Sequence, residues 1–313
     1  MRKYFGTDGI RRIANTELTP ELVYRVAKAG AYVLSKHSNH SPTILIGRDT
    51  RISGTLIESA MVAGFLSYGA NVKLLGIIPT PAVAYLTRKL KADASVVISA
   101  SHNTYEFNGI KFFSNKGTKI PDKLEEEIEE AMETGKIDEI KAVNDKIGIS
   151  EYRQDLIDEY VYFFRKNFDS NIENLNKEDF VVALDTANGA TYKVAEKIFK
   201  ALGIKYHILN NNPNGININD GCGSTHIEML KKYVKENNIS IGFAYDGDGD
   251  RCLAVDENGE EIDGDKIMAI ISRYLKKKGK LNKDTIVATV MSNLGLHKYA
   301  EKNKLELVQT QVG

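Results

Sequence analysis

The sequence contains no tryptophan and only two cysteines, Cys222 and Cys252. Because these cysteines form no CxxC pair, the sequence predicts neither a disulfide framework nor a zinc site. An excess of charge of one sign is also lacking, since Lys and Arg together number 42 and so do Asp and Glu. A net charge of zero gives no electrostatic reason to expect nucleic acid or an anionic membrane surface as a partner.

Long apolar runs are absent as well. The N-terminal stretch Met1-Arg-Lys-Tyr-Phe5 is not the apolar core of a signal peptide, and no run approaches the roughly 20 residues of a membrane-spanning helix. We therefore expect a cytoplasmic protein. A chain of 313 residues is too long for one typical domain, so two or three domains are predicted.

One pattern recurs three times along the chain: an apolar strand, a polar or glycine-rich loop, a helix and a second strand. Its instances begin at Thr43, Phe180 and Thr285. Parallel strands joined by helical crossovers are the natural product of such units. The sequence therefore predicts an α/β fold with mostly parallel sheets.

Local patterns predict how these units are connected. We expect a long helix over residues 150–168, a short strand over 111–113, and a helix whose start is capped by Asp122 and Glu125. The domains expected from this organisation span 1–150, 151–252 and 253–313.

The stretch Ser99-Ala-Ser-His-Asn103 directly follows the pattern of a buried strand, and strand ends of open α/β sheets are where ligands and catalytic groups lie. The loop is expected to continue to Lys111, which would gather a serine, a histidine and a lysine. Ser101 is not framed by Gly-x-Ser-x-Gly, and the adjacent His102 is poorly placed to act as its base, so a serine hydrolase is not indicated. An ordinary polar turn is the alternative.

A second polar stretch, Asp246-Gly-Asp-Gly-Asp-Arg251, lies between two strand patterns, and we expect it to be an exposed loop. Carboxylates at every second position of an extended segment point to one side, and three hard oxygen ligands suit Mg²⁺. Arg251 adds a planar group that suits phosphate. An EF-hand loop is a poorer match, because its sixth position requires glycine where this loop has Arg251. A solvated acidic turn is the other alternative.

Four short motifs follow one another along the chain: Phe5-Gly-Thr-Asp-Gly-Ile-Arg11, Gly47-Arg-Asp-Thr-Arg51, Ser99-Ala-Ser-His-Asn103 and Asp246-Gly-Asp-Gly-Asp-Arg251. Together they resemble the α-D-phosphohexomutase family, and residues 117–122 and 217–226 are similar to its amino-sugar branch. The resemblance implies three similar three-layer α/β domains with mixed, mostly parallel sheets around a central cleft, followed by a fourth domain of another type.

The resemblance also implies a phosphoenzyme. Ser101 would be a phosphoserine that donates its phosphoryl group to a sugar phosphate and takes another back. One Mg²⁺ would be held by the phosphorylated Ser101 and by the side chains of Asp246, Asp248 and Asp250, which would offset the charge of the phosphate.

Four further residues match family motifs around the transferring group: Arg11, His102, Lys111 and Arg251. Either Lys111 or His102 would move the proton of the sugar hydroxyl. Two arginines of the second motif, Arg48 and Arg51, would brace the serine loop.

The substrate implied is glucosamine 6-phosphate, converted to the 1-phosphate on the route to UDP-N-acetylglucosamine and cell-wall precursors. Glucosamine 1,6-bisphosphate would be both intermediate and activator. A second copy of the chain or a regulatory protein would be the macromolecular partner. Two alternatives stay open: a phosphoglucomutase or phosphomannomutase that acts on a neutral sugar, and a catalytically silent fragment that serves as a binding module.

Two features depart from the family's pattern. Arg12 stands where glycine usually follows Arg11, and it would add charge and bulk beside the site. The chain is also expected to end inside the third domain, before its sugar-reading loop of the form Gly-Glu-x-Ser-Gly and before the fourth domain with its phosphate-binding loop. We therefore expect at best a trace of mutase activity from this chain alone.

Overall fold

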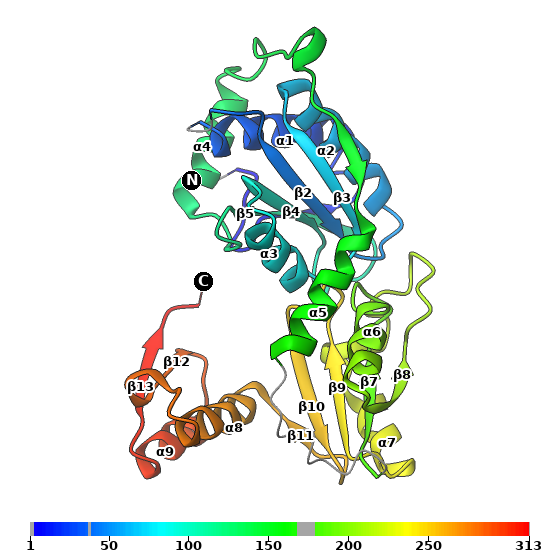
Figure 1. The fold of residues 1–313 in the computed structure, drawn as a ribbon, viewed down its shortest axis with the longest axis vertical. Coiled ribbons are helices and arrows are strands. Elements are labelled where there is room, and N and C mark those ends of the chain that lie inside the picture. Colours follow the sequence, from blue (N-terminus) through cyan, green and yellow to red (C-terminus); the bar gives the residue numbers. More distant parts are fainter. Residues whose placement is uncertain (1–2, 37–38, 168–178, 313) are drawn as a thin grey trace.

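The computed structural model describes residues 3–36, 39–167 and 179–312. Its strands form two large sheets, one above the other along the long axis of the molecule, and a small third sheet lies beside the second (Figure 1). Each sheet and its helices are called here the first, second and third unit.

The first unit has a six-stranded sheet in the order β1-β5-β4-β2-β3-β6. Neighbouring strands run parallel from β4 through β2 and β3 to β6, whereas β5 is antiparallel to both β4 and β1. The strands are β1 Ile10–Ile13, β2 Thr43–Arg48, β3 Asn71–Ile77, β4 Ala94–Ile98, β5 Phe107–Ser114 and β6 Ser150–Tyr152. The helices are α1 Pro20–Leu34, α2 Gly54–Tyr68, α3 Thr80–Lys89 and α4 Asp122–Glu133.

Apolar side chains of the first sheet alternate between two separate cores. Ile44 and Ile46 of β2 pack into one core with α1, α2 and α4, whereas Leu45 points the other way, into a core with α3. This alternation is the period of two that a strand imposes on its side chains. The first unit is therefore a sheet between two layers of helices.

The second unit repeats this plan with a sheet in the order β11-β10-β9-β7-β8. Val182 and Leu184 of β7 pack with α6 on one face, and Ala183 packs with α7 on the other. The elements are α5 Ile157–Asn167, β7 Val181–Asp185, α6 Val194–Leu202, β8 Lys205–Leu209, α7 Glu228–Glu236, β9 Ile241–Tyr245, β10 Cys252–Asp256 and β11 Glu261–Ile262.

The third unit is smaller. Helix α8 and the crossover helix α9 pack on a parallel pair of strands, β12 and β13. The bounds are α8 Gly264–Lys277, β12 Thr285–Thr289, α9 Leu294–Lys302 and β13 Glu306–Thr310. The strand–helix–strand unit predicted three times is thus confirmed as β2-α2-β3, β7-α6-β8 and β12-α9-β13, and the strands of each pair run parallel.

Three local predictions were wrong. The helix expected over 150–168 begins only at Ile157, because residues 150–152 pair with β3 as the edge strand β6; Phe168 lies outside the described residues. The strand expected over 111–113 extends over Phe107–Ser114, because it pairs along its length with β4 and β1. Helix α4 is not capped by a side chain, since its N-cap is Pro121 and Glu125 instead forms an ion pair with Lys119 at 2.9 Å.

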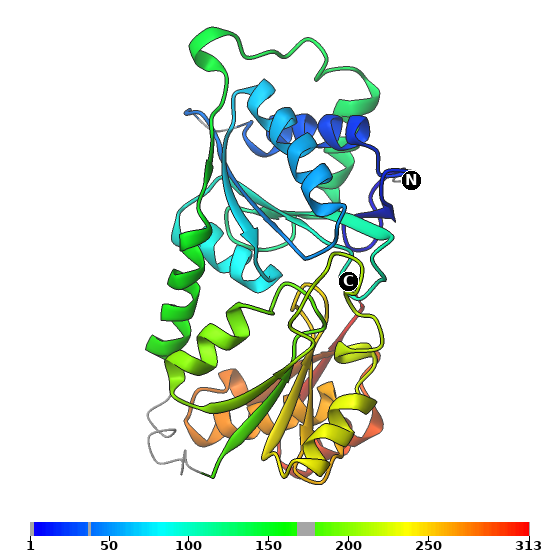
Figure 2. The same cartoon turned by 90° about the vertical axis from the view of Figure 1, so that its right-hand side faces the viewer.

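Helix α5 joins the first two units. It starts the second unit, yet Ile157 and Tyr160 at its beginning, with Leu156 just before it, complete the core under α3. Both cartoon views show α5 spanning the junction of the two large sheets (Figures 1 and 2). Among the described residues, no helix has the length and apolar character needed to cross a membrane.

Candidate functional site

The serine loop, residues 99–103, leaves β4 at the junction of the first two units. Ser101 is 1% exposed and adopts a left-handed backbone conformation with φ of 53°. Such a conformation costs a non-glycine residue roughly 1–2 kcal/mol, so the surrounding contacts must maintain it. The Ser101 hydroxyl donates a hydrogen bond to Asp246 Oδ2 at 2.6 Å, which joins two motifs from different units.

A buried polar network in the first unit supports this loop from below. Ser99 Oγ donates to Asp49 Oδ2 at 2.5 Å and accepts from the backbone N–H of Ser101 at 3.0 Å. Asp49 also forms an ion pair with Arg51 at 3.1 Å. Burial raises the pKa of Asp49, while Arg51 and the Ser99 hydroxyl oppose that rise. The network holds the serine loop at the end of β4.

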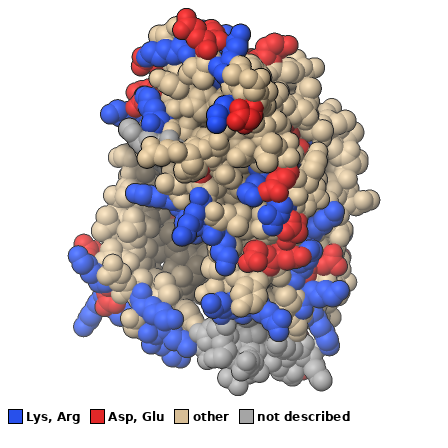
Figure 3. All heavy atoms as spheres, turned by 45° about the horizontal axis from the view of Figure 1, so that its top comes forward, with Lys and Arg blue, Asp and Glu red and all other residues tan. Residues whose placement is uncertain are grey.

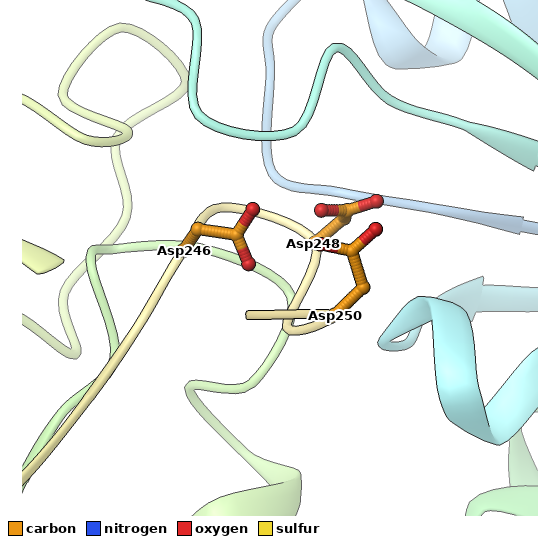
Figure 4. Close-up of side chains that lie close together, drawn as sticks. All are labelled: Asp246, Asp248 and Asp250. Carbon is orange, nitrogen blue, oxygen red and sulfur yellow. The ribbon is translucent and has the colours of Figure 1, made fainter. Parts of the chain in front are cut away.

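The aspartate loop, residues 246–250, forms a tight turn between β9 and β10. One carboxylate oxygen from each of Asp246, Asp248 and Asp250 lies within 4.8 Å of the others, and Figure 4 shows the three side chains grouped around the turn. The expected extended, exposed segment is wrong: Gly249 has φ of 68°, and Asp246 and Asp248 are buried. The turn, rather than strand alternation, brings the carboxylates together.

Crowding of these carboxylates shifts their proton affinities. Burial, reinforced by the charges of Asp248 and Asp250, raises the pKa of Asp246 to about 7. Burial also disfavours ionisation of Asp248, but Lys111 and the hydroxyl of Thr80 lower the pKa of Asp248 overall. Thr80 Oγ1 donates to Asp248 Oδ2 at 2.8 Å. The group therefore carries strong negative potential that a cation would relieve.

Lys111 supplies part of the missing positive charge. Its Nζ atom lies 2.8 Å from Asp8, 3.1 Å from Asp248 and 3.4 Å from Asp250, and its side chain is 3% exposed. Burial alone would lower the pKa of Lys111, but the carboxylates of Asp248 and Asp250, together with Asp8, raise it well above its ordinary value. Lys111 is therefore a permanent cation here.

The residues at the aspartate loop suit a divalent cation. Among the described residues, buried Asp248 Oδ1 has no hydrogen-bond partner, which leaves a ligand atom available. Three carboxylates that are close together in a turn are a hard-oxygen donor set of the kind that Mg²⁺ prefers. Asp246, Asp248 and Asp250 would hold such an ion beside the Ser101 hydroxyl.

Three more predicted residues lie around the serine loop. Arg11 reaches Asp8 and Asn103, each at 3.4 Å. Arg251 is exposed, while its backbone N–H donates to Asp246 Oδ1 at 3.1 Å. Burial lowers the pKa of His102, and the positive charges of Arg251 and Arg11 lower it further. The structure thus brings all eight predicted site residues to one place, and the lowered pKa favours the neutral form of the His102 imidazole.

The three remaining arginine predictions had different outcomes. Arg51 braces the serine loop, because its guanidinium donates to the carbonyl oxygens of Ser101 at 3.0 Å and Asn103 at 2.9 Å. Within the described residues Arg48 makes no hydrogen bond to the serine loop; its guanidinium pairs with Glu58 at 3.4 Å and donates to the carbonyl of Asp49 at 3.4 Å. Arg12 turns to the carbonyl oxygen of Lys3 at 2.9 Å, and nothing places its side chain in the site.

Sequence reasoning missed several residues that shape the site: Asp8, Asp49, Thr80, Ser99 and Asn219. Asp8 and Asp49 lie inside motifs already quoted, so their position in those motifs was the available signal. Thr80 belongs to a Pro-Thr-Pro sequence at the start of α3, and Asn219 to an Asn-rich loop. Neither pattern indicates a contact with a loop more than 100 residues away.

Comparison with known proteins identifies relatives of the whole chain. Residues 2–139, 158–259 and 263–313 match the family described as phosphoglucomutase/phosphomannomutase, in its alpha/beta/alpha domains I, II and III respectively. The phosphoglucosamine mutase of Acetivibrio thermocellus is 53% identical over 313 residues, and that of Ruminiclostridium cellulolyticum is 51% identical. Both matches cover 100% of this chain and 69% of the relative.

Solved structures show the same fold at low identity. A phosphoglucomutase/phosphomannomutase family protein from Burkholderia thailandensis matches with a TM-score of 0.83 at 20% identity, covering 100% of this chain and 67% of that one. The phosphoglucomutase parafusin from Paramecium matches with a TM-score of 0.77 at 18% identity, covering 99% of this chain and 62% of that one.

Proposed function

This chain belongs to the phosphoglucomutase/phosphomannomutase family of isomerases, the α-D-phosphohexomutases, and we propose that its site serves the conversion of glucosamine 6-phosphate into glucosamine 1-phosphate. The amino sugar is inferred from the relatives, since phosphoglucosamine mutases are about half identical to it along its full length. The hydrogen bond of 2.6 Å between Ser101 and Asp246 carries the proposal, because it joins a nucleophile to a metal-type carboxylate cluster.

The reaction consists of two phosphoryl transfers through Ser101. In the first, the C1 hydroxyl of glucosamine 6-phosphate attacks the phosphorus of phosphorylated Ser101, the bond from phosphorus to Ser101 Oγ breaks, and glucosamine 1,6-bisphosphate forms. In the second, Ser101 Oγ attacks the 6-phosphate of the bisphosphate, which releases glucosamine 1-phosphate and restores the phosphoserine. Such transfers depend on positioning and on charge stabilisation, which this site supplies with cations around Ser101.

The charge states of His102 and Lys111 favour His102 as the proton carrier. Lys111 is held as a cation by three carboxylates and has no lone pair with which to accept a proton. His102 has a lowered pKa and a buried, unpartnered Nδ1 atom within the described part of the chain. We assign the proton of the attacking hydroxyl to His102, and charge neutralisation to Lys111, Arg11 and Arg251.

Mg²⁺ bound by Asp246, Asp248 and Asp250 would supply Lewis-acid stabilisation of the charge on the transferring phosphoryl group. Lys111 and Thr80 orient the Asp248 carboxylate through contacts of 3.1 and 2.8 Å. Arg251, which directly follows the loop, offers a planar fork suited to a phosphate.

The test is direct phosphorylation of the protein. Incubation with Mg²⁺ and glucosamine 1,6-bisphosphate should add one phosphate, which intact-mass measurement detects and peptide mapping locates at Ser101. The variant Ser101→Ala should gain none. Phosphate found on Ser99, which is 1% exposed at the start of the same loop, would contradict the assignment. The same experiment with glucose and mannose bisphosphates ranks the sugars, and the amino sugar should react fastest.

A further inference from the structure

Asn219 connects the second unit to the serine loop. It lies in the Asn-rich loop after β8, is 4% exposed, and its backbone N–H donates to the carbonyl of Ala187 at 2.9 Å. Its side-chain Nδ2 atom donates to the carbonyl oxygen of Ser101 at 2.9 Å and to that of Asn103 at 3.0 Å. Because carbonyl oxygens only accept hydrogen bonds, these contacts fix the orientation of the Asn219 amide.

The same two carbonyl oxygens also accept hydrogen bonds from Arg51. Arg51 belongs to the first unit, like the serine loop, and its Nη2 atom lies 3.0 Å from Ser101 O and 2.9 Å from Asn103 O. Arg51 therefore fixes the shape of the loop within its own unit. Asn219 instead belongs to the unit that carries the aspartate loop, so it fixes the position of Ser101 relative to the three carboxylates.

The aspartate loop packs closely against both the serine loop and Asn219. A Cβ atom on Gly247 would come within 2.6 Å of Ser101 O and 2.8 Å of Asn219 Nδ2. Glycine at 247 thus permits the close approach of three segments: the serine loop, the aspartate loop and Asn219. Within the described residues, Asn219 Oδ1 has no hydrogen-bond partner, so the side-chain hydrogen bonds of Asn219 all go to the serine loop.

We propose that Asn219 is a positioning residue for phosphoryl transfer, which aligns Ser101 with the aspartate loop across the junction of the two units. The inference rests on the proposed function of Ser101. Group transfer requires the reacting atoms to be held near their reactive geometry, and a displacement of about 1 Å can reduce the rate about 10²-fold. Asn219 acts through the backbone of the serine loop, because among the described residues its side-chain amide donates only to carbonyl oxygens of that loop.

The test compares substitutions of two asparagines in one loop. Asn219→Asp keeps the shape of the side chain and its tolerance of φ near 58°, but removes both donors. Asn219→Gly removes the donors without adding charge and suits the same backbone conformation. The control Asn217→Asp removes a donor that serves only Asn212, at 3.1 Å.

Two measurements are made on the full chain. Rapid-quench intact-mass analysis gives the maximal rate of Ser101 phosphorylation by glucosamine 1,6-bisphosphate and the concentration giving half that rate. Both Asn219 variants should lower the maximal rate about 10²-fold and leave the half-saturating concentration unchanged, while Asn217→Asp behaves as wild type. Hydrogen exchange should accelerate at residues 100–104 in the Asn219 variants and stay unchanged in β4, a pattern that general destabilisation would not produce.

The outcomes separate the two hypotheses. Wild-type phosphorylation rates in both Asn219 variants would overturn the positioning role, and so would equal slowing by Asn217→Asp. If the wild-type protein gains no phosphate, the proposed function of Ser101 fails. Hydrogen exchange then decides the role of Asn219, because unchanged exchange in the serine loop refutes the alignment as well.

Discussion

At the scale of single residues, the site holds negative charges that repel one another, and the surrounding residues neutralise them only in part. Three carboxylates have oxygens within 4.8 Å of one another, and their repulsion adds to burial in raising the pKa of Asp246. The positive charge of Lys111 offsets part of this repulsion, because Lys111 forms ion pairs with Asp248 and Asp250. Sites with such shifted groups are candidates for metal binding and catalysis, because the protein maintains them at the expense of stability.

Asp248 and Asp250 should respond differently to removal of their charge. Asp248→Asn should weaken Mg²⁺ binding and also lower the free energy of unfolding by about 1.5–3 kcal/mol, because its buried carboxylate accepts from Lys111 and Thr80. Asp250 has a side chain 34% exposed, and burial and the charge of Asp248 raise its pKa despite the ion pair with Lys111 at 3.4 Å, so its negative charge is unfavourable in the folded protein. Asp250→Asn should therefore weaken Mg²⁺ binding without lowering the stability of the metal-free protein.

Titration calorimetry with MgCl₂ and urea unfolding in EDTA test this pair of variants. Asp145→Asn serves as the control, since Asp145 is exposed and far from the loop in the sequence, and it should change neither quantity. Unchanged Mg²⁺ affinity in both loop variants would remove the aspartate loop from the metal site.

At residue scale, the candidate site residues that carry the proposed chemistry were predictable from their motifs, whereas the residues that support them were not. Ser101 and the three aspartates follow strands and have the residue types that phosphoryl transfer requires, so the sequence indicated them. Asn219 and Thr80 form bonds to residues more than 100 positions away, and such pairs leave no periodicity or spacing to read. Fold assembly, rather than local pattern, brings these two residues to the site.

At the scale of elements, the repeated strand–helix–strand units were predictable because apolar periodicity and glycine breaks agree with the final structure. The edge strand β6 was not. Its sequence Ser-Glu-Tyr is exposed on every residue, so no hydrophobic alternation marks it, and only pairing with β3 defines it as a strand. The helical pattern of Leu156, Ile157 and Tyr160 directly after it favoured a longer helix.

Contact between α1 and α2 depends on a glycine. A Cβ atom at Gly64 would lie 2.5 Å from the carbonyl oxygen of Tyr24 and 2.7 Å from the Cβ of Ala27. Gly64→Ala should therefore destabilise the protein by about 1–3 kcal/mol, even though alanine alone favours helix by about 1 kcal/mol. Chemical denaturation followed by circular dichroism measures the effect.

A matched glycine at the start of another helix provides the control. Gly264 is the first residue of α8, and a Cβ atom there would meet nothing within 4 Å. Gly264→Ala should be neutral or slightly stabilising, because it reduces the freedom of the unfolded chain without creating a clash. Equal destabilisation by the two substitutions would contradict the packing argument.

At the scale of the whole molecule, the first two units share more structure than either shares with the third. Helix α5 contributes to the core under α3, and Thr50 Oγ1 donates to the carbonyl of Asn188 in the second unit at 2.5 Å. Positive and negative side chains are interspersed over the face seen in Figure 3. The common core, the buried hydrogen bonds and the ion pairs of Lys111 with Asp248 and Asp250 therefore couple the two units that build the site.

We expect the third unit to unfold locally, before the rest of the chain. Its buried core is small and consists of apolar side chains from β12 and α9 together with Leu305. Val287 and Met291 of the same unit are 62% and 77% exposed. Segments with few buried apolar contacts open at low free energy. Native-state hydrogen exchange in low denaturant should therefore show much weaker protection of amides in β12 and β13 than in β2 and β7.

Two leucine variants test whether this opening is local. Leu296 is 2% exposed in the third unit, and Leu184 is fully buried in β7 of the second. Each Leu→Ala change should cost about 2–5 kcal/mol in its own core. Leu296→Ala should accelerate amide hydrogen exchange in β12 and β13 only, because few contacts pass the loss of stability from the third unit to the other two. Leu184→Ala should accelerate exchange in both β7 and β2, because α5 and the site loops make the first two units one cooperative structure. Equal acceleration of all three units by Leu296→Ala would show that the third unit is part of that structure.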